Sequence, residues 1–114
     1  MTPLRHINDD ECRPFQWAVE LIGKRWSSGI MLAVLQGATR FSEIVARVDG
    51  LSDRMLAQRA RELEAAGLLA REVVPSIPVQ IRYSLTERGE DLLAALQPVM
   101  RWEQRWRGVP PSRP

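Results

Sequence analysis

The order of three segments within residues 41–86 constrains the fold more than any other feature of the chain: two short helical patterns precede a hairpin pattern whose loop is bracketed by prolines. In the first pattern, apolar residues recur at the spacing that brings them to one face of a helix. These residues are Phe41, Ile44, Val45 and Val48. An Asp-Gly pair at residues 49–50 then favours a turn, so we expect this helix to end there.

The second helical pattern carries signals for both of its ends. Ser52 is a good N-cap, Asp53 places negative charge in the first turn, and Gly67 suits the position just past a helix end. The residues predicted to pack on the core lie in a narrow arc made by Leu56, Ala60 and Leu63, with Met55 and Arg59 at its edges. Two helices joined by a tight glycine turn are typical of helix-turn-helix modules.

The opposite face of the second helix carries side chains that suit DNA. Arg54, Gln58 and Arg61 point away from the predicted core. Arg and Gln can form bidentate hydrogen bonds with purine edges in the major groove, and the small Ala57 can meet a thymine methyl. A solvated surface is the other interpretation of this face, because Arg and Gln are also ordinary helix formers.

The hairpin pattern favours the DNA-binding interpretation. Residues 68–74 and 81–85 have strand-like content and alternation, and Pro75-Ser-Ile-Pro78 prevents regular pairing between them. A stiff loop between two strands predicts a wing, on which Arg71 and Arg82 can reach phosphate or the minor groove. A hairpin that only covers the core, with solvated arginines, is the alternative.

These segments predict a mainly α fold with a small β-hairpin (α+β), a winged helix-turn-helix. The recognition helix is expected at about residues 52–66 and the wing at about residues 74–81. Upstream, residues 15–22 form a helical pattern with Phe15, Ala18, Val19 and Ile22 inward, and residues 26–35 form a more apolar pattern that we expect to be the buried central helix.

A long helix is predicted at about residues 87–106, capped by Thr86 and bent by Pro98. Its large apolar residues are Leu92, Leu93, Leu96, Val99, Met100, Trp102 and Trp106. They are too many for a solitary terminal helix to hide, so a partner surface is expected. Folding back onto its own domain is the alternative.

Several motifs together resemble one known family. They are Cys12-x-Pro14, Leu21-Ile-Gly-Lys-Arg-Trp26, Arg40-Phe-Ser-Glu-Ile44, Ser52-x-Arg-Met-Leu56, Arg61-Glu-Leu-Glu64, Gly67-Leu68, Pro75-x-x-Pro78 and Tyr83-Ser-Leu-Thr-Glu87 with Gly89. In this order the chain resembles the HxlR-type bacterial transcription regulators, dimeric winged-helix proteins of the MarR-like group. The resemblance covers roughly residues 12–106. The chain departs from the family pattern at Ala60, where a larger apolar residue is more frequent, at Val74, where an aromatic is frequent, and at Arg82, where an acidic residue is common.

The resemblance implies that the first and last helices of two subunits pack together. The residues expected in this interface are Phe15, Trp17, Leu92, Leu96, Val99, Met100, Trp102 and Trp106. The residues expected to contact double-stranded DNA are Arg40, Ser52, Arg54, Ala57, Gln58, Arg61, Arg71 and Arg82. A two-fold dimer would present two recognition helices about one helical turn apart, so the operator should be an inverted repeat.

We expect a sequence-specific regulator that acts as a repressor, because the compact chain has no separate segment for contacting polymerase. Two alternatives stay open. One is a winged helix that binds a protein partner without specific DNA binding. The other is a regulator that responds to a small ligand, bound between the base of the wing and the terminal helices, where Trp17, Trp26, Trp102 and Trp106 would supply aromatic surface.

Cys12 is a candidate redox sensor. It is expected just before a helix N-terminus, with Arg13 adjacent, and both features stabilise a thiolate. Some members of the resembled family respond to oxidants or electrophiles at this position. Because the chain has one cysteine, the available products are a disulfide between subunits, a mixed disulfide or an alkylated thiol. An inert cysteine, opposed by the acidic residues 9–11, is the alternative.

The composition restricts the remaining classes. A length of 114 residues suits one domain, divided here into a flexible arm at residues 1–11, a winged-helix domain at residues 12–107 and a disordered tail at residues 108–114. The formal net charge is only +2, so a nucleic-acid footprint must come from the placement of charges.

The single histidine, His6, falls in the arm, and no cluster has metal-ligand spacing, so we expect no enzyme, metal or cofactor. The absence of an apolar span or signal peptide predicts a cytoplasmic protein.

Overall fold

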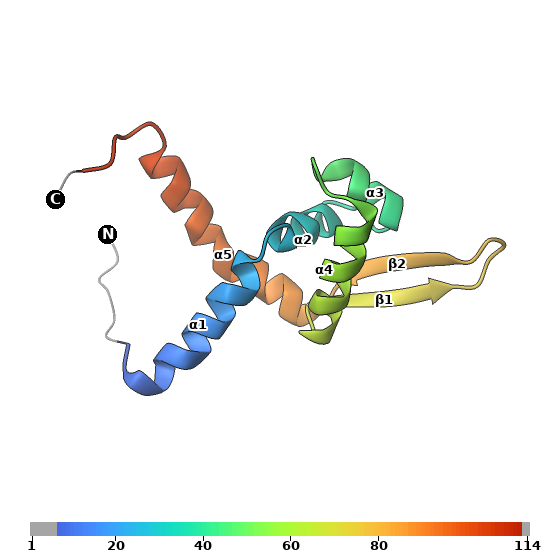
Figure 1. The fold of residues 1–114 in the computed structure, drawn as a ribbon, viewed down its shortest axis with the longest axis horizontal. Helices are drawn as coiled ribbons and strands as arrows, with labels where there is room; N and C mark the ends of the chain where they lie inside the picture. The colour runs from blue at the N-terminus through green and yellow to red at the C-terminus, as the bar shows by residue number, and fades with distance from the viewer. Residues whose placement is uncertain (1–6, 113–114) are drawn as a thin grey trace.

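The computed structural model describes residues 7–112, so His6 and the start of the predicted arm lie outside the described residues. Within this range the chain forms five helices and one antiparallel hairpin (Figure 1). The elements are α1 (Asp9–Gly23), α2 (Ser27–Leu35), α3 (Phe41–Arg47), α4 (Asp53–Ala65), β1 (Leu69–Val74), β2 (Gln80–Leu85) and α5 (Glu87–Trp106).

Helices α2, α3 and α4 form the predicted helix-turn-helix body. Helix α4 begins where the sequence predicts, because the Ser52 hydroxyl accepts a hydrogen bond of 3.1 Å from the backbone N–H of Met55. Gly67, with φ of 76°, ends this segment in the left-handed conformation that glycine tolerates best. Helix α2 is the central helix, since most of its apolar residues are buried.

Strand β2 has the alternation that the sequence predicts, whereas β1 is buried at Leu69 and then exposed along most of its length. Strand β1 pairs with β2 from Leu69 opposite Leu85 to Val74 opposite Gln80, and residues 75–79 form the loop. Tyr83 is buried at the centre of β2 and donates its backbone N–H to the Thr39 carbonyl at 2.8 Å. The segment before α3 therefore joins the hairpin along the middle of β2, where Arg40 bridges to Arg82.

Helix α5 is fixed to this body at its first turn. The Thr86 hydroxyl accepts from Gly89 N–H at 3.0 Å and donates to the Gly67 carbonyl at 2.5 Å. A side chain at Gly89 would overlap the Leu68 carbonyl oxygen, so only glycine permits this close approach of α5 to the residue before β1.

The shape of the molecule is elongated because α1 and most of α5 project from the body as two diverging arms (Figure 1). The molecule measures 60 × 36 × 22 Å and has a radius of gyration of 17.0 Å. A compact domain of this length would have a radius of gyration of about 13 Å. The arms are thus not folded onto the body.

The structure corrects the predicted start of the domain. Helix α1 begins at Asp9, whereas the sequence interpretation placed a flexible arm through residue 11 and the first helix at residues 15–22. The difference arises because Asn8 caps the helix, its side chain accepting from Glu11 N–H at 3.1 Å, and because the acidic residues 9–11 suit a helix N-terminus. Cys12 consequently lies inside α1 rather than before it.

The predicted inward face of the first helix is also only partly correct. Ala18 and Ile22 are half-buried, but Phe15 and Val19 are 56% and 50% exposed. The reason is that α1 leaves the body along its length, so only its last turns pack on neighbouring helices.

Candidate nucleic-acid interface

The two faces of α4 differ in the way that the sequence predicts. Leu56, Ala60 and Leu63 are at most 1% exposed and form part of the core. Arg54, Gln58 and Arg61 are exposed on the other side, and Ala57 is half-buried between the two faces. The helix is therefore anchored by one face and leaves free a face with two guanidinium groups and an amide.

Ser52 and Arg40 lie at the N-termini of α4 and α3. The backbone N–H of Arg40 donates to the Glu43 carboxylate at 3.3 Å, and the Arg40 guanidinium lies 3.9 Å from the same group. Both Arg40 and Glu43 are about half exposed at their side chains, so this ion pair is weak and leaves Arg40 available to a phosphate. Ser52 uses its oxygen as a helix cap and keeps its hydroxyl proton to donate.

The two wing arginines lie on opposite faces of the hairpin. Arg71 is paired with Tyr83, so it shares the face of the strand that packs on the body. Arg82 is paired with Glu72 on the other face and bridges to Arg40. The structure thus groups Arg40 with Arg82 and separates both from Arg71. This difference follows from the register of the hairpin, which places Arg71 opposite Tyr83 and Arg82 opposite Glu72.

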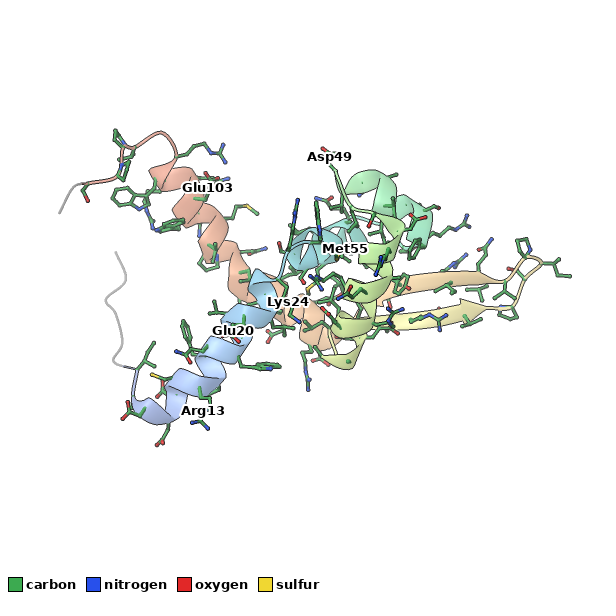
Figure 2. The ribbon with its side chains drawn as sticks, viewed as in Figure 1. Arg13, Glu20, Lys24, Asp49, Met55 and Glu103 are labelled. Atoms are coloured by element: carbon green, nitrogen blue, oxygen red, sulfur yellow. The ribbon has the colours of Figure 1, made fainter. Side chains whose placement is uncertain are left out.

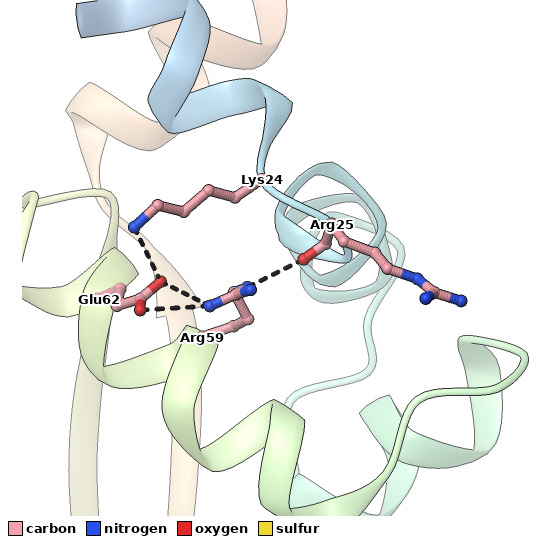
Figure 3. A network of polar contacts seen from close by, with 4 residues as sticks. All are labelled: Lys24, Arg25, Arg59 and Glu62. Atoms are coloured by element: carbon pink, nitrogen blue, oxygen red, sulfur yellow. Dashed lines mark hydrogen bonds and ion pairs between the residues drawn. The ribbon is translucent and has the colours of Figure 1, made fainter.

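A polar network that the sequence interpretation did not identify joins α4 to the segment between α1 and α2 (Figure 3). The Arg59 guanidinium donates to both carboxylate oxygens of Glu62, at 3.0 and 3.2 Å, and to the backbone carbonyl of Arg25 at 2.9 Å. The Lys24 ammonium lies 3.5 Å from the same carboxylate. The available signal was the position of Arg59 at the edge of the buried arc, three residues before an acidic residue.

The charges in this network determine the ionisation of Glu62. Partial burial of the carboxylate raises its pKa, but the nearby positive charges of Arg59 and Lys24 outweigh that effect, and a hydrogen bond from Gln58 adds to them. The pKa of Glu62 therefore lies below its ordinary value. Glu62 is a carboxylate throughout the neutral range.

The arms expose the residues predicted to form a dimer interface. Helix α1 contains no buried residue, and Phe15 and Trp17 are 56% and 61% exposed. On α5, Leu92 and Leu96 are half-buried, and the remaining candidates are more than half exposed: Val99, Met100, Trp102 and Trp106. Figure 2 shows the side chains standing out from both arms, with Glu20 on α1 and Glu103 on α5 well separated.

Two apolar grooves lie where the arms meet the body. One, of about 340 Å³, is lined by residues of α1 and α5 with Trp17, Arg88 and Asp91 at its wall. The other, of about 400 Å³, runs between α2 and α5 from Leu32 to Met100. The four tryptophans considered for a ligand pocket are not brought together. Trp26 faces Gly50 in the turn between α3 and α4, and neither groove is lined by Trp102 or Trp106.

Cys12 lies in the second turn of α1 and is exposed. Among the described residues no group of three or more His, Cys, Asp and Glu side chains is placed to hold a metal ion. None of the described helices is both long and apolar enough to cross a membrane.

A helix-turn-helix with a free Arg and Gln face, followed by a wing, defines a DNA-binding transcriptional regulator. Residues 21–110 match the family model described as HxlR-like helix-turn-helix. The chain belongs to this family, as the sequence motifs predict, and it is a regulator rather than an enzyme.

Named relatives and solved structures agree with this membership. The chain is 42% identical to the uncharacterized HTH-type transcriptional regulator YvaP of Bacillus subtilis (strain 168) over 101 residues, which cover 88% of this chain and 94% of YvaP. It is 37% identical to the regulator YodB of the same organism over 95 residues, covering 83% and 85% of the two chains.

The structure of the reduced form of YodB from B. subtilis has a TM-score of 0.78 at 35% identity, covering 88% of this chain and 98% of that one. The redox regulator HypR in its reduced form has a TM-score of 0.77 at 32% identity, covering 84% and 95%. These similarities confirm the predicted winged-helix fold.

Proposed function

We propose that this regulator binds an inverted-repeat operator as a homodimer and represses transcription. The main support for the proposal is that α4 is amphipathic. It has a buried apolar arc on one side and exposed Arg54, Gln58 and Arg61 on the other. In this proposal the three exposed residues read base edges in the major groove, and Ala57 meets a thymine methyl.

The remaining contacts would position the protein on the duplex. Arg40 and Arg82 lie next to each other at the middle of β2, and Ser52 lies at the start of α4. Contacts from these groups to phosphates would fix the register and supply most of the salt dependence. Arg71, on the other face of the hairpin, would contribute from the side nearer the body.

The homodimer is supported by the exposed arms. Half-exposed tryptophans on α5 and exposed aromatic residues on α1 form apolar surface that a second copy can cover. Two copies related by a two-fold axis would place two α4 helices on one face of the DNA, and the half-sites of the operator would then be inverted.

The test is fluorescence anisotropy with DNA from upstream of the protein's own gene and with scrambled DNA of equal length. Replacing both Arg54 and Arg61 with Ala should abolish the preference for the upstream DNA while sedimentation shows the same oligomeric state as the wild type. Retained preference in this double variant would refute the assignment of α4 as the reading helix. Absence of preference in the wild type at every salt concentration would favour the protein-partner alternative.

A second function, sensing of thiol oxidants through Cys12, is favoured by the exposure of this cysteine near the N-terminus of α1. Solved relatives include YodB in reduced and diamide-treated forms and the redox regulator HypR in reduced and oxidised forms. Since the chain has one cysteine, oxidation by diamide would join two thiols of different subunits, or one thiol and a small thiol, while diamide takes up two electrons and two protons.

The oxidant response has its own test. Diamide should lower the affinity of the wild type for the upstream DNA, and dithiothreitol should restore it. Cys12→Ser should bind DNA as tightly as the reduced wild type and show no response to diamide. Equal responses of the two proteins would remove Cys12 from the mechanism without affecting the DNA-binding proposal.

A further inference from the structure

The short segment between α1 and α2 touches the DNA-binding unit at two places. The ring of Trp26, which has a left-handed φ of 79°, lies where a side chain at Gly50 would meet it, in the turn between α3 and α4. The carbonyl of Arg25 accepts the hydrogen bond from Arg59 of α4. Residues 24–26 therefore fix both the turn and the recognition helix relative to the end of α1.

Arg59 is the centre of this attachment. Its side chain is only 15% exposed, although it belongs to the helix proposed to meet DNA. Glu62 receives two hydrogen bonds from the Arg59 guanidinium, which leaves the Nε–H directed at the Arg25 carbonyl (Figure 3). A guanidinium held by a carboxylate has little freedom to rotate, so the bond to the carbonyl is formed at low entropic cost.

Glu62 lies next to the reading face. Gln58, one turn earlier on α4, is its i−4 neighbour on the helix surface, and it helps to lower the pKa of the Glu62 carboxylate. The same carboxylate lies near Lys24 at the end of α1. One acidic side chain thus contacts Arg59 and Lys24, and it neighbours a residue proposed to contact bases.

We infer that Arg59 and Glu62 are positioning residues for DNA recognition, which hold α4 in place by clamping it to the segment between α1 and α2. The inference rests on the proposed function, because it assumes that α4 reads DNA. Neither residue contacts DNA itself. Because the clamped segment leads directly into α1, a change in the angle of α1 would be passed to the recognition helix.

Replacement of the Glu62 carboxylate gives a test in which two explanations predict opposite changes in DNA affinity. If Glu62 were only a surface charge, Glu62→Gln would strengthen DNA binding, because it removes a negative charge from a DNA-facing helix. If Glu62 positions α4, the variant should bind the upstream DNA about tenfold more weakly, the effect of a 1.4 kcal/mol change. Glu64→Gln is the matched control, with the same charge change on the same helix, and it should bind as tightly as the wild type or more tightly.

The slope of affinity against salt separates positioning from direct contact. Arg59→Met keeps the length of the buried side chain and removes its charge and hydrogen bonds. The specific affinity should fall while the slope of log affinity against log salt stays the same. A slope reduced by about one unit would mean that Arg59 contacts a phosphate, and it would overturn the inference.

A milder variant covers the case in which these changes impair folding. The side chain of Lys24 is 49% exposed, so Lys24→Gln should leave the unfolding temperature unchanged and weaken specific binding by about threefold, the effect expected of a partly exposed ion pair. Arg13→Gln, with the same charge change at the far end of α1, is the control. Equal affinities for Lys24→Gln and Arg13→Gln, together with equal affinities for Glu62→Gln and Glu64→Gln, would overturn the inference.

Hydrogen exchange measured without DNA distinguishes failure of the clamp from failure of the proposed function. Backbone amides of α4 and of residues 25–27 should exchange faster in Glu62→Gln than in Glu64→Gln. Faster exchange in a protein whose wild type shows no DNA preference would refute the proposed function and leave the clamp as a structural feature only. Unchanged exchange would refute the clamp whatever the DNA affinity.

Discussion

The helix-turn-helix body and the two projecting arms differ in how far each can bury its own apolar side chains. In the body, Ile30, Ile44 and Leu56 have no measurable exposure, and α4 turns its polar face outward. In the arms, α1 buries no residue completely, and Trp102 and Trp106 are more than half exposed. The contrast indicates that the helix-turn-helix body is complete within one chain, and it supports the proposal that a second copy covers the arms.

The strongest test of the contrast is removal of a core side chain. Leu56→Ala should lower the free energy of unfolding by about 2–5 kcal/mol, because it opens a cavity beneath α4. Val19→Ala, on the exposed part of α1, should cost less than about 1 kcal/mol in the monomer. Urea unfolding of both variants at low protein concentration measures the difference, and similar losses would show that body and arm share one core.

Substitutions in the arms should weaken the dimer rather than destabilise the fold of the single chain. Trp102→Ala should weaken the dimer by about 2 kcal/mol or more, because a half-exposed Trp in the proposed interface is a typical hot spot. Sedimentation equilibrium measures this change, with Gln104→Ala as a control on the same helix. A monomeric wild type, or a variant that dimerises as well as the wild type, would contradict the role assigned to α5.

Within the DNA-binding unit, the two wing arginines should not be equivalent. Arg82→Ala should cost about 1 kcal/mol on all DNA sequences and reduce the salt slope by about one unit, since Arg82 lies beside Arg40. Arg71→Ala should have a smaller effect, because Arg71 lies on the hairpin face that packs on the body. A larger loss for Arg71→Ala would mean that the opposite face of the hairpin meets the duplex.

The smallest expected effect concerns pH. Because the folded-state pKa of Glu62 is depressed, its contribution to stability is present above the unfolded value of 4.5 and is lost as pH falls through the lower folded value. The difference in unfolding free energy between wild type and Glu62→Gln should be roughly 0.5 kcal/mol at neutral pH and should approach zero as pH falls below the lowered folded-state pKa. A difference that grows on acidification would contradict the depressed pKa. The measurement is urea unfolding across this pH range.

Local signals predicted the body well. The expected recognition helix at about residues 52–66 agrees with α4 between its caps, because Ser52 and Gly67 set its ends through backbone chemistry that involves few distant residues. The long helix predicted at about residues 87–106 agrees with α5 for the same reason, since Thr86 caps it. The wing loop follows from Pro75 and Pro78, which cannot pair regularly.

Features that depend on contacts between distant residues were not predictable in this way. The earlier start of α1 was missed for a different reason: its Asn8 cap is a local signal, but the acidic stretch that follows also resembles a solvated arm. The bond from Arg59 to the Arg25 carbonyl joins residues 34 positions apart, and no periodicity encodes it. The separation of Arg71 from Arg82 depends on the register of the hairpin, which the loop and the buried Tyr83 set together.

The most direct measurement is a competition titration of the wild-type protein at one fixed salt concentration, with labelled upstream DNA bound and either unlabelled upstream or scrambled DNA as the competitor. A dimeric regulator that reads bases through α4 should prefer its own site by about a thousandfold or more. Equal competition by the two DNAs would contradict specific recognition by this face.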